Sequence, residues 1–242
     1  MGAVGVPRRS RLWLAIGLTF IVALLAAQPV CLAPPAAPAA DHHVSVDGHH
    51  DHLGAMPGEI AAADSLVFAR RTQPVWPAIH ELSLWLGAQD TGAEIVGMNK
   101  GGSVEVHGVR VTMVRAEHSA GDWLPDEGVP IYLGEPAGFV VGLENGRSLY
   151  HAGDTALFGD MRLIGEMYRP DVAFLPIGGH FTMDPTAAAR AVELLGVAAV
   201  VPIHYGTFPI LAGTPEQLRE ELEHLGLGDV RVIAPKPGAV VS

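Results

Sequence analysis

Short apolar runs alternate with amphipathic segments from residue 44 onward, and this alternation restricts the fold more than any other feature of the sequence. Continuous or alternating apolar runs are typical of strands, whereas apolar side chains every three or four positions are typical of helices. Strands and helices that follow one another along a chain pack as layers around one core. A chain of 242 residues is long enough for one such domain with a full core and a cleft. We therefore predict a single α/β domain.

Eight segments have the composition of strands. They are Val44–Val46, Glu94–Met98, Val104–His107, Val111–Arg115, Gly138–Leu143, Ser148–His151, Val172–Pro176 and Val197–Ile203. Asn145-Gly146 lies between two of them as a hairpin turn. Helices are predicted to begin at Asp184-Pro185 and Thr214-Pro215, because in each pair a capping side chain precedes a first-turn proline. A third helix is predicted at 80–89, and the mixture of hairpins and helical connections predicts mixed sheets.

Charge and cysteine content exclude several kinds of function. Three of the 15 basic residues lie in the first 40 positions, so the remainder has 12 basic side chains against 26 acidic ones. A protein that grips a phosphate backbone needs a basic surface, so we expect a small-molecule substrate and no nucleic acid. Cys31 is the only cysteine, which excludes an internal disulfide and a site of several thiolates. Imidazole and carboxylate are then the ligands available to a metal such as zinc.

The strongest local signal for chemistry is the cluster Asp47-Gly48-His49-His50-Asp51-His52, which is too polar and too compact for a core. On a loop that leaves the strand before it, His49 and Asp51 could face one metal ion while His52 reaches a second ion. A solvated, histidine-rich surface loop would have the same composition. The cluster alone therefore leaves both interpretations open.

Three later residues favour the metal site. His118, Asp154 and His204 each follow an apolar, strand-like run. Loops at the carboxyl ends of strands carry the ligand and catalytic groups of α/β folds, so these exits and that of the histidine cluster could share one cleft. A single histidine after a strand is more often structural than ligating, but the ordered set is difficult to attribute to chance.

The cluster resembles the His-x-His-x-Asp-His motif of the metallo-β-lactamase superfamily, and the three later residues match the remaining ligands of that superfamily in order. Further segments resemble its metal-dependent hydrolases related to L-ascorbate-6-phosphate lactonases, namely 134–138 (GEPAG), 150–155 (YHAGDT), 175–183 (LPIGGHFTM) and 204–207 (HYGT). The resemblance covers roughly residues 44–235. It implies an αββα sandwich of mixed sheets flanked by helices, and hydrolysis of a small-molecule lactone, ester or phosphoester by a metal-bridged hydroxide.

The resemblance implies a dinuclear site with two divalent ions, zinc in the first place and manganese as the alternative. Six side chains would hold these ions, namely His49 and His118 for one ion, Asp51, His52 and His204 for the other, and Asp154 as a bridge. Two ions about 3.5–4 Å apart can hold a hydroxide, lower its pKa and polarise the scissile bond. Asp51 would also be catalytic, because it would orient that hydroxide.

Three further side chains near these ligands are candidates for other roles. His180 and Tyr205 would contact the substrate, whereas His151 is expected to pack in the core or to satisfy a hydrogen bond. The remaining histidines match no ligand position of the family, so we assign them to the surface or to structural roles.

Asp47 stands where the motif has its first histidine. An aspartate can bind zinc through oxygen, but it is shorter than histidine and adds negative charge to a site that already has two aspartates. Either Asp47 serves as a ligand, or one of the two ions binds weakly.

Residues 1–40 differ from the hydrolase domain that we assign to residues 41–242. Arg8, Arg9 and Arg11 precede an uncharged run from Leu12 to Ala27 and an Ala/Pro-rich stretch, which are the three parts of a secretory signal. The resemblance implies that the first strands of the family precede the histidine cluster, with a Gly-His-Ser/Ala turn and an Asp-Pro pair, and the sequence has neither of these two signals. We expect either an export signal before a shortened domain or an aberrant translation start, and we favour the second because a truncated sheet exposes an edge. The protein would be exported in the first case and cytoplasmic in the second, and would meet a membrane only if the apolar run is genuine and uncleaved.

Two other functions remain open at this point. A thioesterase of the glyoxalase II kind would use the same metal cage on a thioester. A non-catalytic metal-binding protein with a degenerate site would account for Asp47 and for the missing strands. The sequence does not reveal the substrate.

Overall fold

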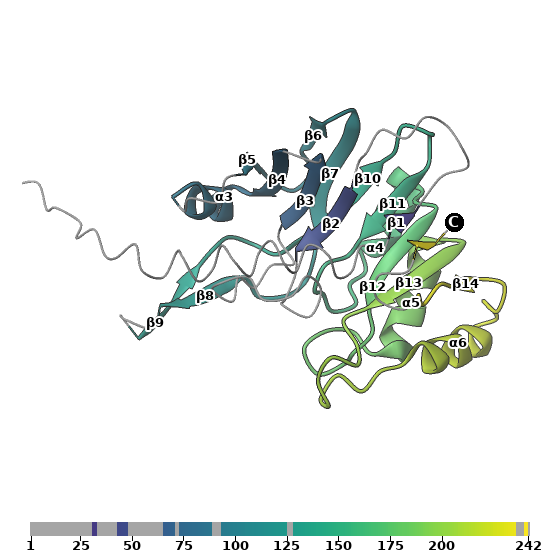
Figure 1. The fold of residues 1–242 in the computed structure, drawn as a ribbon. Coiled ribbons are helices and arrows are strands. Elements are labelled where there is room, and N and C mark those ends of the chain that lie inside the picture. The colour runs from purple at the N-terminus through teal and green to yellow at the C-terminus, as the bar shows by residue number, and fades with distance from the viewer. Residues whose placement is uncertain are drawn as a thin grey trace, which may run out of the picture.

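The computed structural model describes residues 31–32, 43–47, 65–70, 73–88, 93–124, 128–235 and 240–241, and its two main sheets form layers with helices (Figure 1). The larger sheet has the order β14-β13-β12-β11-β10-β7-β6. Its strands are β6 (Ser103–Val106), β7 (Val109–Arg115), β10 (Ala137–Gly142), β11 (Ser148–His151), β12 (Val172–Pro176), β13 (Ala199–Ile203) and β14 (Arg231–Val232). The smaller sheet consists of β2 (His43–Asp47), β3 (Ser65–Arg70), β4 (Gln73–Ile79) and β5 (Glu94–Met98), in that order.

Helices cover these sheets. Helix α3 (His80–Gly87) packs on β4 and β5 of the smaller sheet. One face of the larger sheet packs on the smaller sheet. The opposite face is covered by α4 (Met161–Tyr168), α5 (Pro185–Leu195) and α6 (Pro215–His224). This arrangement confirms the predicted α/β sandwich, in which mixed sheets are flanked by helices. No helix in the described ranges is long and apolar enough to cross a membrane.

Two smaller strand pairs lie outside the layers. Strand β1 (Cys31–Leu32) pairs with β15 (Val240–Val241). The antiparallel hairpin of β8 (Gly121–Leu124) and β9 (Val129–Tyr132) extends away from both sheets (Figure 1). This hairpin connects β7 to β10.

Strand β10 shows why the larger sheet is apolar on both faces. Phe139 and Val141 belong to the core shared with the smaller sheet and α3, whereas Val140 belongs to the core beneath α4, α5 and α6. Successive side chains of a strand point to opposite faces, so a strand covered on both sides has a continuous apolar run. Burial of Phe139 alone stabilises the fold by about 1.5–3 kcal/mol.

The strand directions place four connections at one edge of the larger sheet. Strands β11, β12 and β13 are parallel to one another. Strand β10 is antiparallel to both β7 and β11, so β7 runs in the same direction as β11. The carboxyl ends of β7, β11, β12 and β13 therefore all lie at the same edge, and the loops that follow them are neighbours.

Local capping fixes the helices that the sequence predicts. The Asp184 carboxylate accepts a hydrogen bond from the Ala187 amide at 2.8 Å, and α5 ends at Gly196 with φ 66°. Thr214 and Gln217 form a reciprocal capping box at the start of α6. A side-chain cap of this kind stabilises a helix by about 1 kcal/mol.

Several elements differ from the prediction. Strand β4 carries Pro74 and Pro77, which removed its strand signal, yet it pairs with both β3 and β5. Helix α4 is not predicted, because it has no side-chain cap and is followed by Arg169 in a left-handed conformation instead of by a glycine. Apart from the strand Cys31–Leu32, residues 1–40 lie outside the described residues, so the two interpretations of that segment stay predictions.

Candidate metal centre

The loops at the common edge of the larger sheet carry most of the described site residues. His118 follows β7, Asp154 follows β11, His180 follows β12, and His204 with Tyr205 follows β13. The sheet topology thus gathers segments that are far apart in the sequence. This arrangement is the one expected for ligand-bearing loops of an α/β fold.

Asp154 and His204 bring two ligand-type side chains close together at this edge. The Asp154 Oδ2 atom lies 3.7 Å from the His204 Nε2 atom, and each side chain is 2% exposed. The distance exceeds that of a direct hydrogen bond between a carboxylate and a ring nitrogen. Burial of a carboxylate and an imidazole together is costly unless they are paired or coordinate a metal.

His118 has a defined ring orientation. Its Nδ1 atom lies 2.9 Å from the carbonyl oxygen of Ser119. A carbonyl oxygen only accepts hydrogen bonds, so the neutral ring carries its proton on Nδ1 and its lone pair on Nε2. Metal-binding histidines commonly have this second contact, which fixes the tautomer and the direction of the ligand atom.

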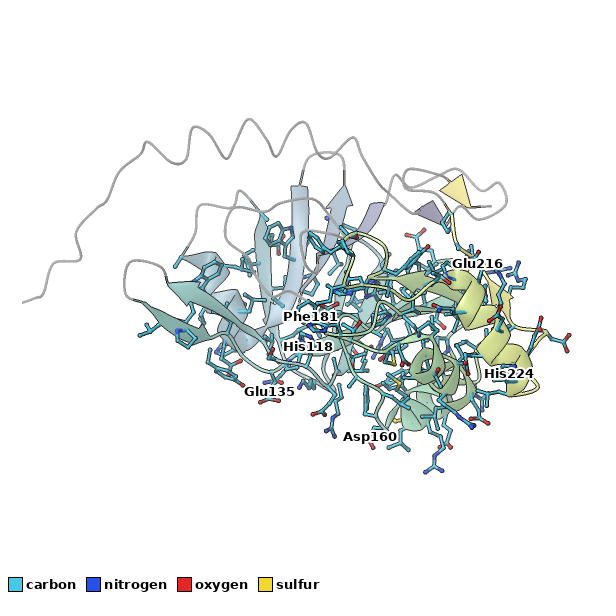
Figure 2. The ribbon with its side chains drawn as sticks, turned by 90° about the horizontal axis from the view of Figure 1, so that it is seen from below. His118, Glu135, Asp160, Phe181, Glu216 and His224 are labelled. Carbon is cyan, nitrogen blue, oxygen red and sulfur yellow. The ribbon has the colours of Figure 1, made fainter. Side chains whose placement is uncertain are left out.

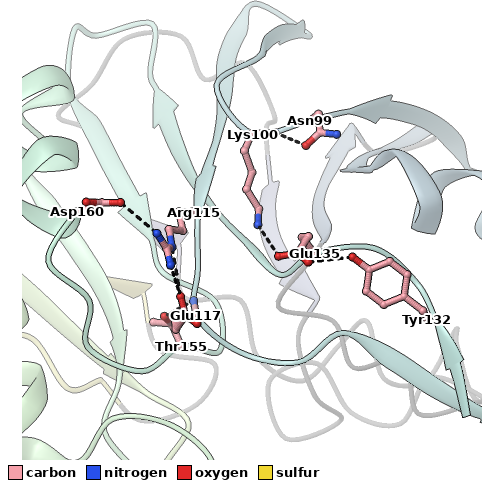
Figure 3. Close-up of polar contacts among 8 residues, drawn as sticks. All are labelled: Asn99, Lys100, Arg115, Glu117, Tyr132, Glu135, Thr155 and Asp160. Atoms are coloured by element: carbon pink, nitrogen blue, oxygen red, sulfur yellow. Dashed lines mark hydrogen bonds and ion pairs between the residues drawn. The ribbon is translucent and has the colours of Figure 1, made fainter.

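Hydrogen bonds join the His118 loop to the Asp154 loop. The Glu117 amide donates to Thr155 Oγ1 at 2.9 Å (Figure 3). The Ala156 amide donates back to the Glu117 carbonyl oxygen at 2.9 Å. The carbonyl oxygen of Thr155 accepts from the Met183 amide at 3.1 Å. Three of the four loops are therefore connected through Thr155 and its neighbour.

An exposed ion-pair network lies beside this connection. Arg115 contacts the Glu117 carboxylate at 2.6 Å and the Asp160 carboxylate at 3.3 Å (Figure 3). The hydrogen bond and the charge of Glu117 raise the pKa of Arg115, with a smaller contribution from Asp160. The network joins the end of β7 to the residue before α4.

The segment 134–138 anchors the hairpin that follows His118. The Tyr132 hydroxyl donates to the Glu135 carboxylate at 3.1 Å, and Lys100 contacts the same carboxylate at 3.7 Å (Figure 3). Gly134 has φ 103°, which favours glycine, and Gly138 lies close to the backbone of residues 151–152. The motif thus connects the hairpin, the larger sheet and the turn before β6.

Two candidate site histidines have strained backbones. His204 has φ 54° and His180 has φ 58°, values that residues other than glycine rarely adopt. Such a conformation costs on the order of 1–3 kcal/mol and concentrates at functional sites. The backbone of Gly178 lies against the His204 carbonyl oxygen, and a side chain at position 178 would collide with that oxygen.

His151 has the structural role that the sequence predicts. Its Nδ1 atom accepts a hydrogen bond from the Gly153 amide at 3.0 Å, and its ring stacks on Phe174 with a centroid distance of 5.4 Å. Gly153 has φ 65° and directly precedes Asp154. The buried imidazole therefore holds the turn that presents Asp154.

Tyr205 lines an open depression beside the His204 loop. The depression has a volume of about 660 Å³ and is also lined by Phe208, Leu211, Thr214 and Glu216. Burial, and secondarily the negative charge of Glu216, raise the pKa of Tyr205. The phenol consequently stays protonated and can donate a hydrogen bond. His180 and its neighbour Phe181 are exposed, and their rings make an edge contact at 4.4 Å.

Part of the predicted ligand set lies outside the described residues, namely His49, Asp51 and His52. Asp47 is the last residue of β2, where its backbone pairs with Ser65. Among the residues that the structure describes, no group of three or more histidine, cysteine or acidic side chains is arranged to hold a metal ion. Asp154 and His204 thus form a pair, and the ligand roles of all the predicted residues stay predictions.

Comparisons with known proteins agree with this fold. A family model described as a beta-lactamase superfamily domain matches residues 17–205. A protein of Roseiflexus castenholzii named UPF0173 metal-dependent hydrolase is 46% identical over 196 residues, which are 81% of this chain and 75% of that protein. A relative of the same name in Rubrobacter xylanophilus is 48% identical over 192 residues, which are 79% of this chain and 74% of that protein.

A solved structure has the same architecture. It is Igni18, described as a metallo hydrolase from the archaeon Ignicoccus hospitalis, with a TM-score of 0.57 and 25% identity. The match covers 81% of this chain and 95% of Igni18.

Proposed function

The chain belongs to the metallo-β-lactamase superfamily and is a metal-dependent hydrolase, and from this premise we propose that it hydrolyses a lactone, ester or phosphoester of a small molecule at a site for two divalent ions. Zinc is the proposed metal, and manganese is the alternative. The proposed ligands are His49, Asp51, His52, His118, Asp154 and His204, with Asp47 as an additional ligand or as the cause of one weaker site.

The pair of Asp154 and His204 carries this proposal. Two ligand atoms on one zinc ion, each about 2.0–2.2 Å from it, are about 3.5 Å apart in tetrahedral geometry. The observed 3.7 Å between Oδ2 and Nε2 is close to that spacing. An oxygen and a nitrogen donor also suit a borderline metal such as zinc. The two side chains therefore fit a shared divalent ion.

The described residues would orient the site and exclude water from it. Bound divalent ions would polarise the scissile bond and lower the pKa of a water molecule. Because Asp154 and His204 are buried, their electrostatic interactions are screened less than at the surface. His118 would present its Nε2 lone pair, since the Ser119 carbonyl oxygen holds the proton on Nδ1.

His180 and Tyr205 are proposed to contact the substrate. Both belong to loops at the edge where Asp154 and His204 lie. The protonated Tyr205 hydroxyl would donate to a carbonyl or phosphoryl oxygen, and its raised pKa keeps it a donor through neutral pH. The exposed ring of Phe181 adds an apolar surface next to His180.

Elemental analysis and turnover test this function. Protein purified without chelator should contain zinc or manganese, and it should hydrolyse at least one member of a panel of phosphorylated lactones, simple esters and phosphoesters. Asp154→Asn keeps the shape of the side chain but removes its charge. We expect it to lower metal affinity by more than about 100-fold, the upper figure for changes around the ligands of a metal.

His224→Gln provides the control. His224 is exposed on α6, and Figure 2 shows it well away from His118. Its replacement should leave metal content and turnover unchanged. A chain that binds no divalent metal contradicts the proposal. Preferential turnover of a thioester would instead support a glyoxalase II-like activity, and metal binding without any turnover would support a non-catalytic protein.

A further inference from the structure

We propose that Thr155 is a positioning residue whose hydroxyl holds the His118 loop and the Asp154 loop in the register needed for metal binding. This role rests on the proposed function, because it acts through the ligands of that site. Thr155 directly follows Asp154, and its side chain is not itself a proposed ligand.

The Thr155 hydroxyl acts as both a hydrogen-bond donor and an acceptor. Oγ1 accepts a hydrogen bond from the Glu117 amide at 2.9 Å and donates its own proton to the Ala156 carbonyl oxygen at 2.8 Å. Donation to Ala156 orients the lone pairs of Oγ1 toward Glu117. A hydroxyl is both donor and acceptor, so only serine could replace both contacts at this length.

These contacts join segments that are distant in the sequence. Glu117 and Thr155 are 38 residues apart, and each is adjacent to a proposed ligand, His118 in one case and Asp154 in the other. The Ala156 amide completes the connection by donating to the Glu117 carbonyl oxygen. A shift of one loop is therefore transmitted directly to the other.

The third loop is attached at the same residue. The carbonyl oxygen of Thr155 accepts from the Met183 amide at 3.1 Å, and Met183 ends the segment that contains His180. Thr155 is 0% exposed, so water does not substitute for its hydroxyl contacts. The rigidity of this buried connection is what a metal site requires, since ligand atoms must be held within a few tenths of an ångström.

Thr155→Val tests the role, because valine keeps the branched shape but removes the hydroxyl. Co²⁺ serves as the probe, since its visible absorption reports the geometry of its ligands without any substrate. We expect Thr155→Val to weaken Co²⁺ binding by about 10- to 100-fold, as for outer contacts of other metal sites, and to change the visible spectrum. Thr155→Ser, which retains the hydroxyl, should restore both. If the valine variant does not fold by near-ultraviolet circular dichroism, Thr155→Ala replaces it in the same comparison.

Thr112→Val is the matched control. Thr112 is also buried, at 6% exposure, and its hydroxyl pairs with that of Ser103 at 2.8 Å between β6 and β7. Loss of this bond should lower thermal stability without changing the affinity for Co²⁺ or the spectrum. This result would show that the Thr155 hydroxyl affects Co²⁺ affinity and ligand geometry, whereas the hydroxyl of another buried threonine affects stability alone.

The outcomes separate this role from the proposed function. Co²⁺ binding without turnover contradicts hydrolysis but leaves the role of Thr155 standing. Unchanged Co²⁺ affinity in Thr155→Val, or an equal loss in Thr112→Val, overturns the role while hydrolysis stands. A wild-type chain that binds no Co²⁺ overturns both.

Discussion

The α-carbon of Gly178 lies so close to the carbonyl oxygen of His204 that no side chain fits between them. His204 has a left-handed backbone, so its position depends on contacts that hold it there. The loop after β12 and the loop after β13 are therefore packed backbone to backbone. Two loops that share this contact move together, and any residue larger than glycine at 178 must displace His204.

Gly178→Ala should impair the site and the fold together. The added methyl forces the His204 backbone to shift, and a strained insertion into a packed region costs about 1–3 kcal/mol. We expect a lower urea midpoint and at least a tenfold loss of zinc affinity, measured by unfolding and by metal titration. Gly159→Ala is the control, because a Cβ atom at Gly159 meets nothing within 4 Å. Wild-type affinity in Gly178→Ala contradicts the prediction.

Asp154→Ala should reduce turnover more than His180→Ala does. The carboxylate of Asp154 is buried beside His204 and is proposed to bridge two ions, whereas His180 is exposed and is proposed to contact only the substrate. Loss of His180 should raise KM with a smaller effect on kcat, and loss of Asp154 should abolish metal binding as well. Steady-state kinetics and metal content check this. Similar residual rates in the two variants contradict the assigned roles.

Asp47→His tests whether Asp47 is a defect or a ligand. A neutral imidazole restores the residue of the family motif and removes one negative charge from a site with several carboxylates. We expect metal stoichiometry or turnover to rise, as measured by elemental analysis and rate. A fall in metal content in a folded variant would instead identify Asp47 as a working ligand. The same substitution behind a family-like N-terminal segment shows whether the preceding residues limit the effect.

Tyr150→Phe should leave the protein at least as stable as the wild type. The Tyr150 side chain is fully buried, and its hydroxyl has no hydrogen-bond partner among the described residues. A buried, unsatisfied hydroxyl costs about 1–3 kcal/mol of desolvation, so its removal should raise the free energy of unfolding by about 1 kcal/mol. Chemical denaturation measures the change. A decrease of more than about 1 kcal/mol would reveal a contact that the hydroxyl makes in solution.

Tyr205 predicts a specific alkaline effect. Its pKa in the folded protein is raised, whereas tyrosines of the unfolded chain ionise near pH 10. The folded state therefore holds a proton that the unfolded state loses, so stability is retained below about pH 10 and falls as the pH rises toward the folded pKa. Between about pH 9 and pH 11, the stability of Tyr205→Phe should therefore fall less than that of the wild type. Urea midpoints measured at intervals of about one pH unit check this. Identical pH dependence contradicts the prediction.

The sequence predicts those elements whose signals are local. The strands Glu94–Met98, Ser148–His151 and Val172–Pro176 are found at the predicted bounds. The apolar run of Ser148–His151 matches its burial in the larger sheet. Helices α5 and α6 begin at the predicted caps. Strand β4 is missed, since Pro77 removes the usual strand pattern although it is tolerated in the pairing with β5.

The site is predicted less completely, because its geometry is not local. Asp154 and His204 lie 3.7 Å apart, and their proximity depends on the order of β11, β12 and β13 in the sheet, which no local signal in the sequence gives. Thr155 is missed as a connection between loops, since its partner Glu117 is 38 residues away. The sequence places Thr155 beside Asp154 and at the end of the family-like segment 150–155, and neither position says what its hydroxyl contacts.

The loops after β7, β11 and β12 are joined by hydrogen bonds, whereas segment 206–210 is exposed. Bonds among Glu117, Thr155 and Met183 fix one part of the edge, while the segment after Tyr205 faces solvent and lines an open depression. Substitutions in the exposed segment carry little thermodynamic penalty. If the substrate enters the depression as proposed for Tyr205, selection could therefore change the accepted compounds there without disturbing the proposed metal ligands. Random libraries confined to residues 207–210 should accordingly yield folded proteins at high frequency and serve as a starting point for altering selectivity.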